Sequence, residues 1–105
     1  MDISGDGKLL YVIGQESNEL VVVDVTSGKV EEKIPVGLRP HTVTLSLDGK
    51  SAFVSNQWAD NIYHIDLDSY EIMDTLVGGS GPSDLVISPD GKHLWCVNSY
   101  SNNIS

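Results

Sequence analysis

The stretch PHTVTLSLDGK, residues 40–50, contains the pattern that decides the fold. Val43, Leu45 and Leu47 alternate with polar residues, which is the period of a β-strand with one buried face. The Asp-Gly-Lys triplet that follows contains a glycine, which can adopt the positive φ angle of a tight hairpin turn. This stretch therefore predicts a strand that ends in a sharp turn.

An internal repeat of 42 residues extends this pattern over the whole chain. Asp-Gly-Lys triplets begin at Asp6, Asp48 and Asp90. When residues 6–47 are laid over residues 48–89 without a gap, ten positions are identical. A period of this length is typical of paired helices or of a four-stranded blade, and the content of each unit decides between the two.

Each unit contains short β-type segments separated by turn residues. In the central unit the predicted strands are Thr42–Leu47, Ala52–Ser55, Ile62–Leu67 and Ile72–Val77. The first unit supplies matching strands at Leu9–Ile13, Leu20–Val25 and Lys29–Val36. A short helix over residues 70–76 is the rival interpretation, but the aligned segment of the first unit contains Gly28 and Pro35, which disfavour a helix.

The predicted fold class is therefore all-β, with four-stranded antiparallel blades. Residues 1–105 are expected to form a single fragment of a larger assembly of blades. It contains a partial blade at 3–36, a complete blade at 40–77 and a second partial blade at 82–105. Alternation along the inner and middle strands predicts the residues buried between neighbouring sheets, namely Val43, Leu45, Val54, Ile65, Leu85 and Ile87.

Composition excludes several classes of function. Six Lys and Arg residues stand against fifteen Asp and Glu residues, for a formal net charge of −9. No basic cluster is present to bind nucleic acid or an anionic membrane surface, so neither is an expected partner. Cys96 is the only cysteine, which excludes an internal disulfide and a multi-cysteine metal site. Met1 is followed by no basic or apolar segment typical of a secretion signal.

The segment IPVGLRPHTVTLS at residues 34–46, with the Asp-Gly-Lys triplet after it, resembles the YVTN-type β-propeller repeat. Degraded forms of the tetrad itself are YVIG at residues 11–14, FVSN at 53–56 and WCVN at 95–98. The second unit departs from the pattern, because its Val77-Gly78 pair is shifted by one position. The resemblance implies propeller blades, which such proteins usually assemble into seven-bladed rings, and a periplasmic or extracellular location.

Two and a half units are expected to be too few to close a ring. Propellers need at least about four blades, and an unfinished stack exposes hydrophobic faces and unpaired strand edges. The expected partner is therefore another copy of this chain, in a homo-oligomer formed through the open blade edges, or the rest of a parent propeller.

Candidate ligand-binding residues gather in the loops that join the second strand to the third and the fourth strand to the next unit. In a radial blade these loops emerge on one face, where propellers commonly bind ligands. The candidates on this face are Arg39, His41, Trp58, Asp60 and Tyr100. The resemblance implies that a histidine placed like His41, after Pro40 and beside the central channel, can point into that channel. The alternative is a histidine that only bonds to neighbouring backbone.

No catalytic constellation can be assembled from the sequence. It contains no Gly-x-Ser-x-Gly elbow, no phosphate-binding glycine loop and no multi-histidine metal pattern, so no metal or cofactor is expected within the chain. The predicted function is a non-enzymatic propeller module that serves as an interaction or structural scaffold. The alternatives are part of a lactonase-like hydrolase, favoured by Pro40-His41, and the propeller portion of a redox enzyme of haem d1 or copper type.

Overall fold

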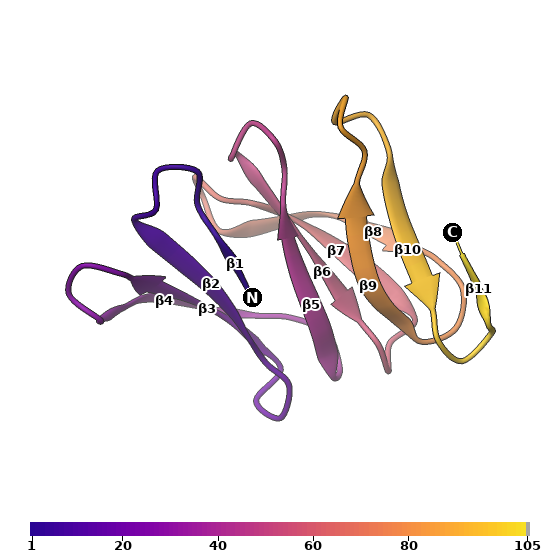
Figure 1. The fold of residues 1–105 in the computed structure, drawn as a ribbon. Coiled ribbons are helices and arrows are strands. Elements are labelled where there is room, and N and C mark those ends of the chain that lie inside the picture. The colour runs from indigo at the N-terminus through magenta and orange to yellow at the C-terminus, as the bar shows by residue number, and fades with distance from the viewer. Residues whose placement is uncertain (105) are drawn as a thin grey trace.

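The computed structural model describes residues 1–104, which fold into eleven short strands and no helix (Figure 1). The strands form three separate antiparallel sheets, and within each sheet the strands follow one another in chain order. The first sheet contains β1 (Asp2–Ile3), β2 (Leu9–Gly14), β3 (Glu19–Asp24) and β4 (Val30–Pro35). The second contains β5 (Pro40–Leu45), β6 (Ser51–Asn56), β7 (Asn61–Asp66) and β8 (Glu71–Val77). The third contains β9 (Pro82–Ile87), β10 (Leu94–Asn98) and β11 (Asn103–Ile104).

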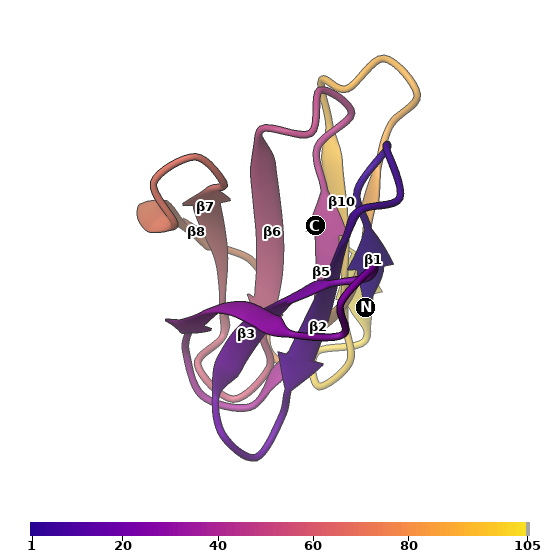
Figure 2. The same ribbon diagram turned by 90° about the vertical axis from the view of Figure 1, so that its left-hand side faces the viewer.

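The three sheets stand side by side with their first strands together. β5 packs against both β1 and β9, whereas the last strands, β4 and β8, lie away from this inner row (Figures 1 and 2). The inner strands are also linked by hydrogen bonds, since the Leu45 amide donates to Oδ2 of Asp2 at 3.0 Å and the Thr44 hydroxyl donates to the Leu85 carbonyl at 3.3 Å. This arrangement is that of consecutive blades around an axis, and it confirms the predicted all-β fold.

Strand alternation places the hydrophobic residues between the sheets. Tyr11, Leu20 and Val22 of the first sheet pack on Val43 and Val54 of the second, and all five are buried. The interface between the second and third sheets buries Ile62, Leu85 and Cys96. Burial of these side chains is the main favourable contribution to the stability of each interface.

The predicted core is correct at four of its six positions. Val43, Val54, Ile65 and Leu85 are buried, whereas Leu45 and Ile87 are only half-buried. Both half-buried residues lie at the ends of their strands, next to the turn, where the covering sheet provides less contact.

The first strand of the central unit lies two residues earlier than the sequence predicts. It covers Pro40–Leu45 and ends before Leu47, which is 65% exposed. The reason is the turn, which begins at Ser46: its amide donates to the Ser51 carbonyl at 2.8 Å and its hydroxyl accepts from the Ser51 amide at 3.0 Å. Leu47 therefore belongs to the turn and not to the strand.

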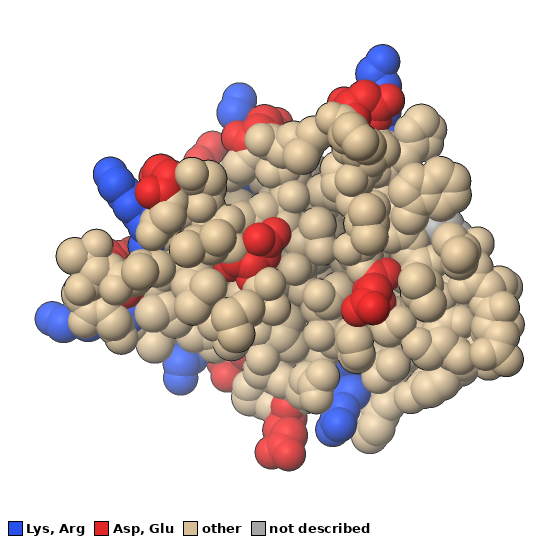
Figure 3. Space-filling view, viewed as in Figure 1, with Lys and Arg blue, Asp and Glu red and all other residues tan. Residues whose placement is uncertain are grey.

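Charged side chains are dispersed over the surface. In the view of Figure 3, Lys and Arg side chains lie singly around the rim, and acidic side chains are spread between them. In residues 1–104 no helix is long and apolar enough to cross a membrane.

Candidate ligand face

The loops between β2 and β3, between β6 and β7, and between β10 and β11 lie at the opposite end of the sheets from the Asp-Gly-Lys turns, at the bottom of Figure 1. The connections from β4 to β5 and from β8 to β9 meet them there. The Gln57 and Trp58 amides donate to the carbonyls of Arg39 and Leu38, at 3.0 and 3.2 Å. One unit later, the Tyr100 amide donates to the Ser80 carbonyl at 3.1 Å. We call this surface the loop face.

One hydrogen bond from a backbone amide to a side-chain oxygen, which recurs 42 residues later, joins each unit to the next on the loop face. Oδ1 of Asn18 accepts from the Arg39 amide at 2.9 Å, and Oδ1 of Asp60 accepts from the Gly81 amide at 2.8 Å. Asn18 and Asp60 have φ angles of 57° and 56°, in the left-handed region that Asn and Asp tolerate better than most residues. The carboxylate of Asp60 therefore holds the backbone of the next unit.

Two buried asparagines accept hydrogen bonds from the same loops on the side of the protein interior. Oδ1 of Asn56 accepts from the Gly37 amide at 3.1 Å, and Oδ1 of Asn98 accepts from the Gly79 amide at 3.1 Å. Both asparagines are fully buried, so their hydrogen bonds are formed out of water, where an unmade bond is costly. Sequence reasoning missed these residues, although their 42-residue spacing and the matching glycines were visible in the repeat.

The structure brings three of the candidate residues into one cluster. The guanidinium carbon of Arg39 lies 5.2 Å from the centre of the Trp58 ring, within the range of a cation–π contact. The indole N–H of Trp58 donates to the Tyr100 hydroxyl at 3.2 Å. Trp58 and Tyr100 are each 60% exposed. Arg39, Trp58 and Tyr100, which we call the aromatic cluster, thus present two rings to solvent beside a half-buried charged residue.

A small hollow of about 240 Å³ lies beside the aromatic cluster. Its lining residues are Gln15, Glu16, Asn18, Leu38, Arg39 and Trp58. They come from two consecutive units, so the hollow depends on the contact between the first and second sheets. Sequence reasoning placed the loop between β2 and β3 on this face but singled out no residue of it.

His41 lies apart from this hollow, on the inner strand β5. Its Nδ1 atom is 3.8 Å from Oδ1 of Asp84 on β9, which is too long for a hydrogen bond, and this buried nitrogen has no hydrogen-bond partner among residues 1–104. The backbone hydrogen bond that the alternative interpretation required is therefore not formed by Nδ1. The five candidates divide into an aromatic cluster, the inter-unit fastener Asp60 and the inner-strand residue His41.

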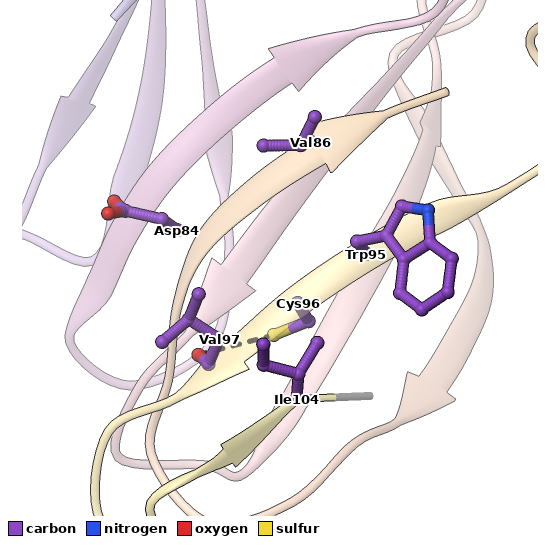
Figure 4. Close-up of a pocket in the computed structure, with 6 residues that line it drawn as sticks. All are labelled: Asp84, Val86, Trp95, Cys96, Val97 and Ile104. Carbon is purple, nitrogen blue, oxygen red and sulfur yellow. Dashed lines mark hydrogen bonds between the residues drawn. The ribbon is translucent and has the colours of Figure 1, made fainter. Parts of the chain in front are cut away.

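A second surface feature, whose lining residues Figure 4 shows, is the outer face of the third sheet. In residues 1–104 no other sheet covers this face. It forms an apolar hollow of about 560 Å³ lined by Asp84, Val86, Trp95, Cys96, Val97 and Ile104. Val86, Trp95, Val97 and Ile104 are 61%, 53%, 44% and 68% exposed. Burial raises the pKa of the Cys96 thiol, so that this group is protonated and unreactive at neutral pH.

Residues 1–104 contain no group of three or more His, Cys, Asp and Glu side chains arranged to hold a metal ion.

Comparison with known proteins relates the chain to solved structures only. No family model matches the sequence, and no curated protein matches it. Among solved structures, the hydrazine synthase of Kuenenia stuttgartiensis is 27% identical with a TM-score of 0.88, over 91% of this chain and 27% of that one. A putative 6-phosphogluconolactonase of Bacteroides fragilis is 20% identical with a TM-score of 0.86, over 98% of this chain and 32% of that one. Virginiamycin B lyase of Staphylococcus aureus is 18% identical with a TM-score of 0.82, over 98% of this chain and 35% of that one.

The chain therefore spans about a quarter to about a third of the length of these structures. Their names describe different proteins, so what they share with this chain is the fold. Residues 1–104 form part of a β-propeller.

Proposed function

We propose that this chain is a non-enzymatic module of a β-propeller, which docks through its open sheet faces with a second copy of itself. The single observation that carries the proposal is the position of Trp95. It lies 42 residues after Phe53 and 84 after Tyr11, at the same place on its sheet. Tyr11 is buried by the second sheet and Phe53 is partly buried by the third, but Trp95 is 53% exposed. The position that is covered by the following sheet in the first and second units is therefore uncovered in the third unit.

The first sheet carries the complementary surface. Leu10, Val12, Val21 and Val23 lie on its outer side, opposite the buried Tyr11, because neighbouring residues of a strand alternate between faces. Val12 occupies the position of Val54 and Cys96 in the later units, and those two residues are buried against the preceding sheet. The outer side of the first sheet is therefore suited to pack on the Trp95 side of another copy.

The number of sheets supports closure by two copies. Each chain contributes three sheets, so two chains joined head to tail at both ends contribute six. Closed propellers usually have about four to eight blades, and a ring of six lies within this range. Both contacts in such a dimer are the same head-to-tail interface, and its closure leaves neither apolar sheet face in water.

Sedimentation equilibrium at micromolar concentration tests this proposal. The unmodified chain is expected to be a dimer, whereas Trp95→Glu and Val86→Glu should be monomers, because each places a charge in the apolar contact. Met73→Glu is the matched control: Met73 is 57% exposed, but it lies on the outer strand β8 and should leave the dimer intact. Circular dichroism checks that each variant is folded. A folded monomer for the unmodified chain would contradict self-assembly and would favour the alternative that the remaining blades of a parent propeller cover these faces.

A further inference from the structure

The backbone at Arg39 adopts a conformation that most side chains disfavour. Its φ angle is 49°, and the residue 42 positions later is Gly81, with a φ angle of 66°. Glycine adopts this region without strain, whereas a residue with a Cβ atom pays about 1–2 kcal/mol. Arg39 therefore breaks a local rule that the next unit keeps. Tyr70 makes the same exchange with Gly28 of the first unit, so the strain alone identifies no function, and the contacts of the arginine side chain have to carry the argument.

Arg39 forms no ion pair in residues 1–104. Only two ion pairs are present there, and both are formed by histidines. The guanidinium group donates no hydrogen bond to these residues and lies over the Trp58 ring instead. Its fork of five donors is therefore free to bind an incoming carboxylate.

Three large exposed side chains lie near this charge. Leu38, Trp58 and Tyr100 are 56%, 60% and 60% exposed, and Trp58 is held in place by Arg39 on its ring and by Tyr100 at its N–H. Trp, Tyr and Arg are the residue types that most often dominate the binding energy of protein interfaces. The two rings and Leu38 therefore lie beside a cation that forms no ion pair.

The size of the hollow distinguishes a protein partner from a small molecule. Small-molecule sites usually have volumes of about 300–1,000 Å³. The hollow beside the aromatic cluster, at about 240 Å³, is smaller and suits a single side chain. Glu16 also lines it, so a segment rich in acidic residues would be repelled there. A single carboxylate next to an apolar group fits both conditions.

We propose that the aromatic cluster of the loop face is the recognition site for a protein segment that presents one carboxylate beside an apolar side chain. Arg39 binds the carboxylate, and Trp58 and Leu38 contact the apolar group. The site lies on the loop face and not on the open sheet faces, so it does not depend on assembly with a second copy. It gives the scaffold a partner in addition to itself.

The probe for the test is N-acetylphenylalaninate, which carries one carboxylate and one apolar ring, and its matched control is the uncharged N-acetylphenylalaninamide. Binding is followed by NMR on the indole N–H signal of Trp58 in the full chain, which is assigned with the Trp58→Phe variant. We expect the carboxylate probe to shift this signal with a dissociation constant in the millimolar range, and the amide to bind about tenfold more weakly. Acetate alone should also bind more weakly than the probe.

Two variants separate recognition from folding. Arg39→Gly adopts the residue that the next unit has at this position, so it should fold normally while weakening the carboxylate probe about tenfold. Lys50→Ala removes the same charge from a distant turn and should change nothing. Equal binding of acid and amide, equal binding by Arg39→Gly, or no shift of the Trp58 signal at any millimolar concentration would each overturn the proposal. The Trp58 signal reports the loop face, and neither variant changes a residue of the open sheet faces, so this outcome is distinct from failure of the dimer.

Discussion

At the scale of single residues, the connection from β4 to β5 passes so close to a buried side chain that one of its positions has no room for a Cβ atom. The φ angle of Gly37 does not lie in the left-handed region, yet a Cβ atom placed there would lie 2.6 Å from Cγ of Asn56. The Asn56 side chain is fully buried and bonds both to the Gly37 amide and to Asn61. Glycine is needed at this position because a buried amide side chain occupies the adjacent space.

Gly37→Ala is therefore expected to lower the free energy of unfolding by about 1–3 kcal/mol, because Asn56 must move and weaken its buried hydrogen bonds. Urea denaturation measures the change. Gly5→Ala is the control, since a Cβ atom at Gly5 meets nothing within 4 Å. A loss at Gly37 no larger than that at Gly5 would show that the loop relaxes freely around Asn56.

The strain at Arg39 predicts different effects for two substitutions. Arg39→Gly should leave the free energy of unfolding within about 1 kcal/mol of the original, because relief of strain offsets the lost contact with Trp58. Arg39→Val should lower it by about 1–3 kcal/mol, since a β-branched residue tolerates a positive φ angle poorly. Thermal or urea unfolding of the two variants distinguishes them. Equal stability of both would show that the backbone at residue 39 changes conformation on substitution.

At the scale of the structural element, the Asp-Gly-Lys turns form one repeated unit of hydrogen bonds. In the second turn the Ser46 hydroxyl donates to Oδ1 of Asp48 at 2.6 Å, and the Lys50 amide donates to the same oxygen at 3.0 Å. The first and third turns contain the same bonds around Asp6 and Asp90. The hydrogen bond from the serine hydroxyl is the largest cause that lowers the pKa of each aspartate below its usual value, and the hydrogen bond from the lysine amide is the second.

These turns are expected to make stability depend on pH in the acid range. A carboxylate whose pKa is lower in the folded state stabilises that state fully above its unfolded pKa of about 4, and the contribution disappears as the pH falls through the lowered folded value. The contribution of Asp48 to the thermal unfolding midpoint should therefore be constant near neutral pH. The midpoint should decrease as the pH is lowered below about 4. In Asp48→Asn the acid-range decrease should be shallower. An unchanged slope would mean that Asp48 has the same pKa in the unfolded chain.

The core strands predict a graded response to truncation. Val54→Ala and Ile65→Ala should each lower the free energy of unfolding by about 1–4 kcal/mol, because both side chains are fully buried between the first and second sheets. Leu47→Ala should cost much less, since Leu47 is 65% exposed in the turn. Denaturant unfolding of the three variants tests the strand register directly. A large loss at Leu47 with small losses at the other two would contradict it.

How far the sequence predicts this structure depends on which interactions determine each part. The strands and the inward-facing Val54 and Ile65 follow from alternation and from the 42-residue period, which are local properties of the sequence. The end of β5 was misplaced, because the hydrogen bonds of Ser46 to Ser51 end the strand although the apolar alternation continues to Leu47. The hydrogen bonds of the turn, and not the apolar alternation, therefore determine where β5 ends.

The candidate site was predictable in its location but not in its contacts. Loop positions placed Arg39, Trp58 and Tyr100 on one face, because a blade brings its connections together. The stacking of Arg39 on Trp58, the bond from Trp58 to Tyr100 and the anchoring by Asn56 depend on the packing of one sheet on the next. Pairings between residues 19 to 42 positions apart cannot be read from the period of one strand.

At the scale of the whole molecule, two covered interfaces coexist with two open ones. The open face at Trp95 is apolar over four large side chains, and the equivalent positions of the earlier sheets are covered. If a second copy covers it, folding and association are coupled, and dilution removes part of the stabilisation.

The thermal unfolding midpoint is therefore expected to rise with protein concentration for the unmodified chain. For Trp95→Glu it should not vary, because that variant is expected to remain a monomer at all concentrations. Scanning calorimetry over a hundredfold range of concentration measures both. A concentration-independent midpoint for the unmodified chain would show that the three sheets are stable without a partner.

The hydrogen bonds that join the units on the loop face have a consequence for how such a chain changes over time. Asn18 holds the amide of Arg39 and Asp60 holds the amide of Gly81, so in each unit the acceptor serves the backbone that follows it. Duplication or loss of a whole 42-residue unit therefore leaves every remaining acceptor next to a donor. A gain or loss of any other length separates an acceptor from its donor and also shifts the strand alternation. Genes for propellers of this kind are expected to lengthen and shorten in whole-unit steps, and the blade number of the ring can change in evolution while the joints between blades stay the same.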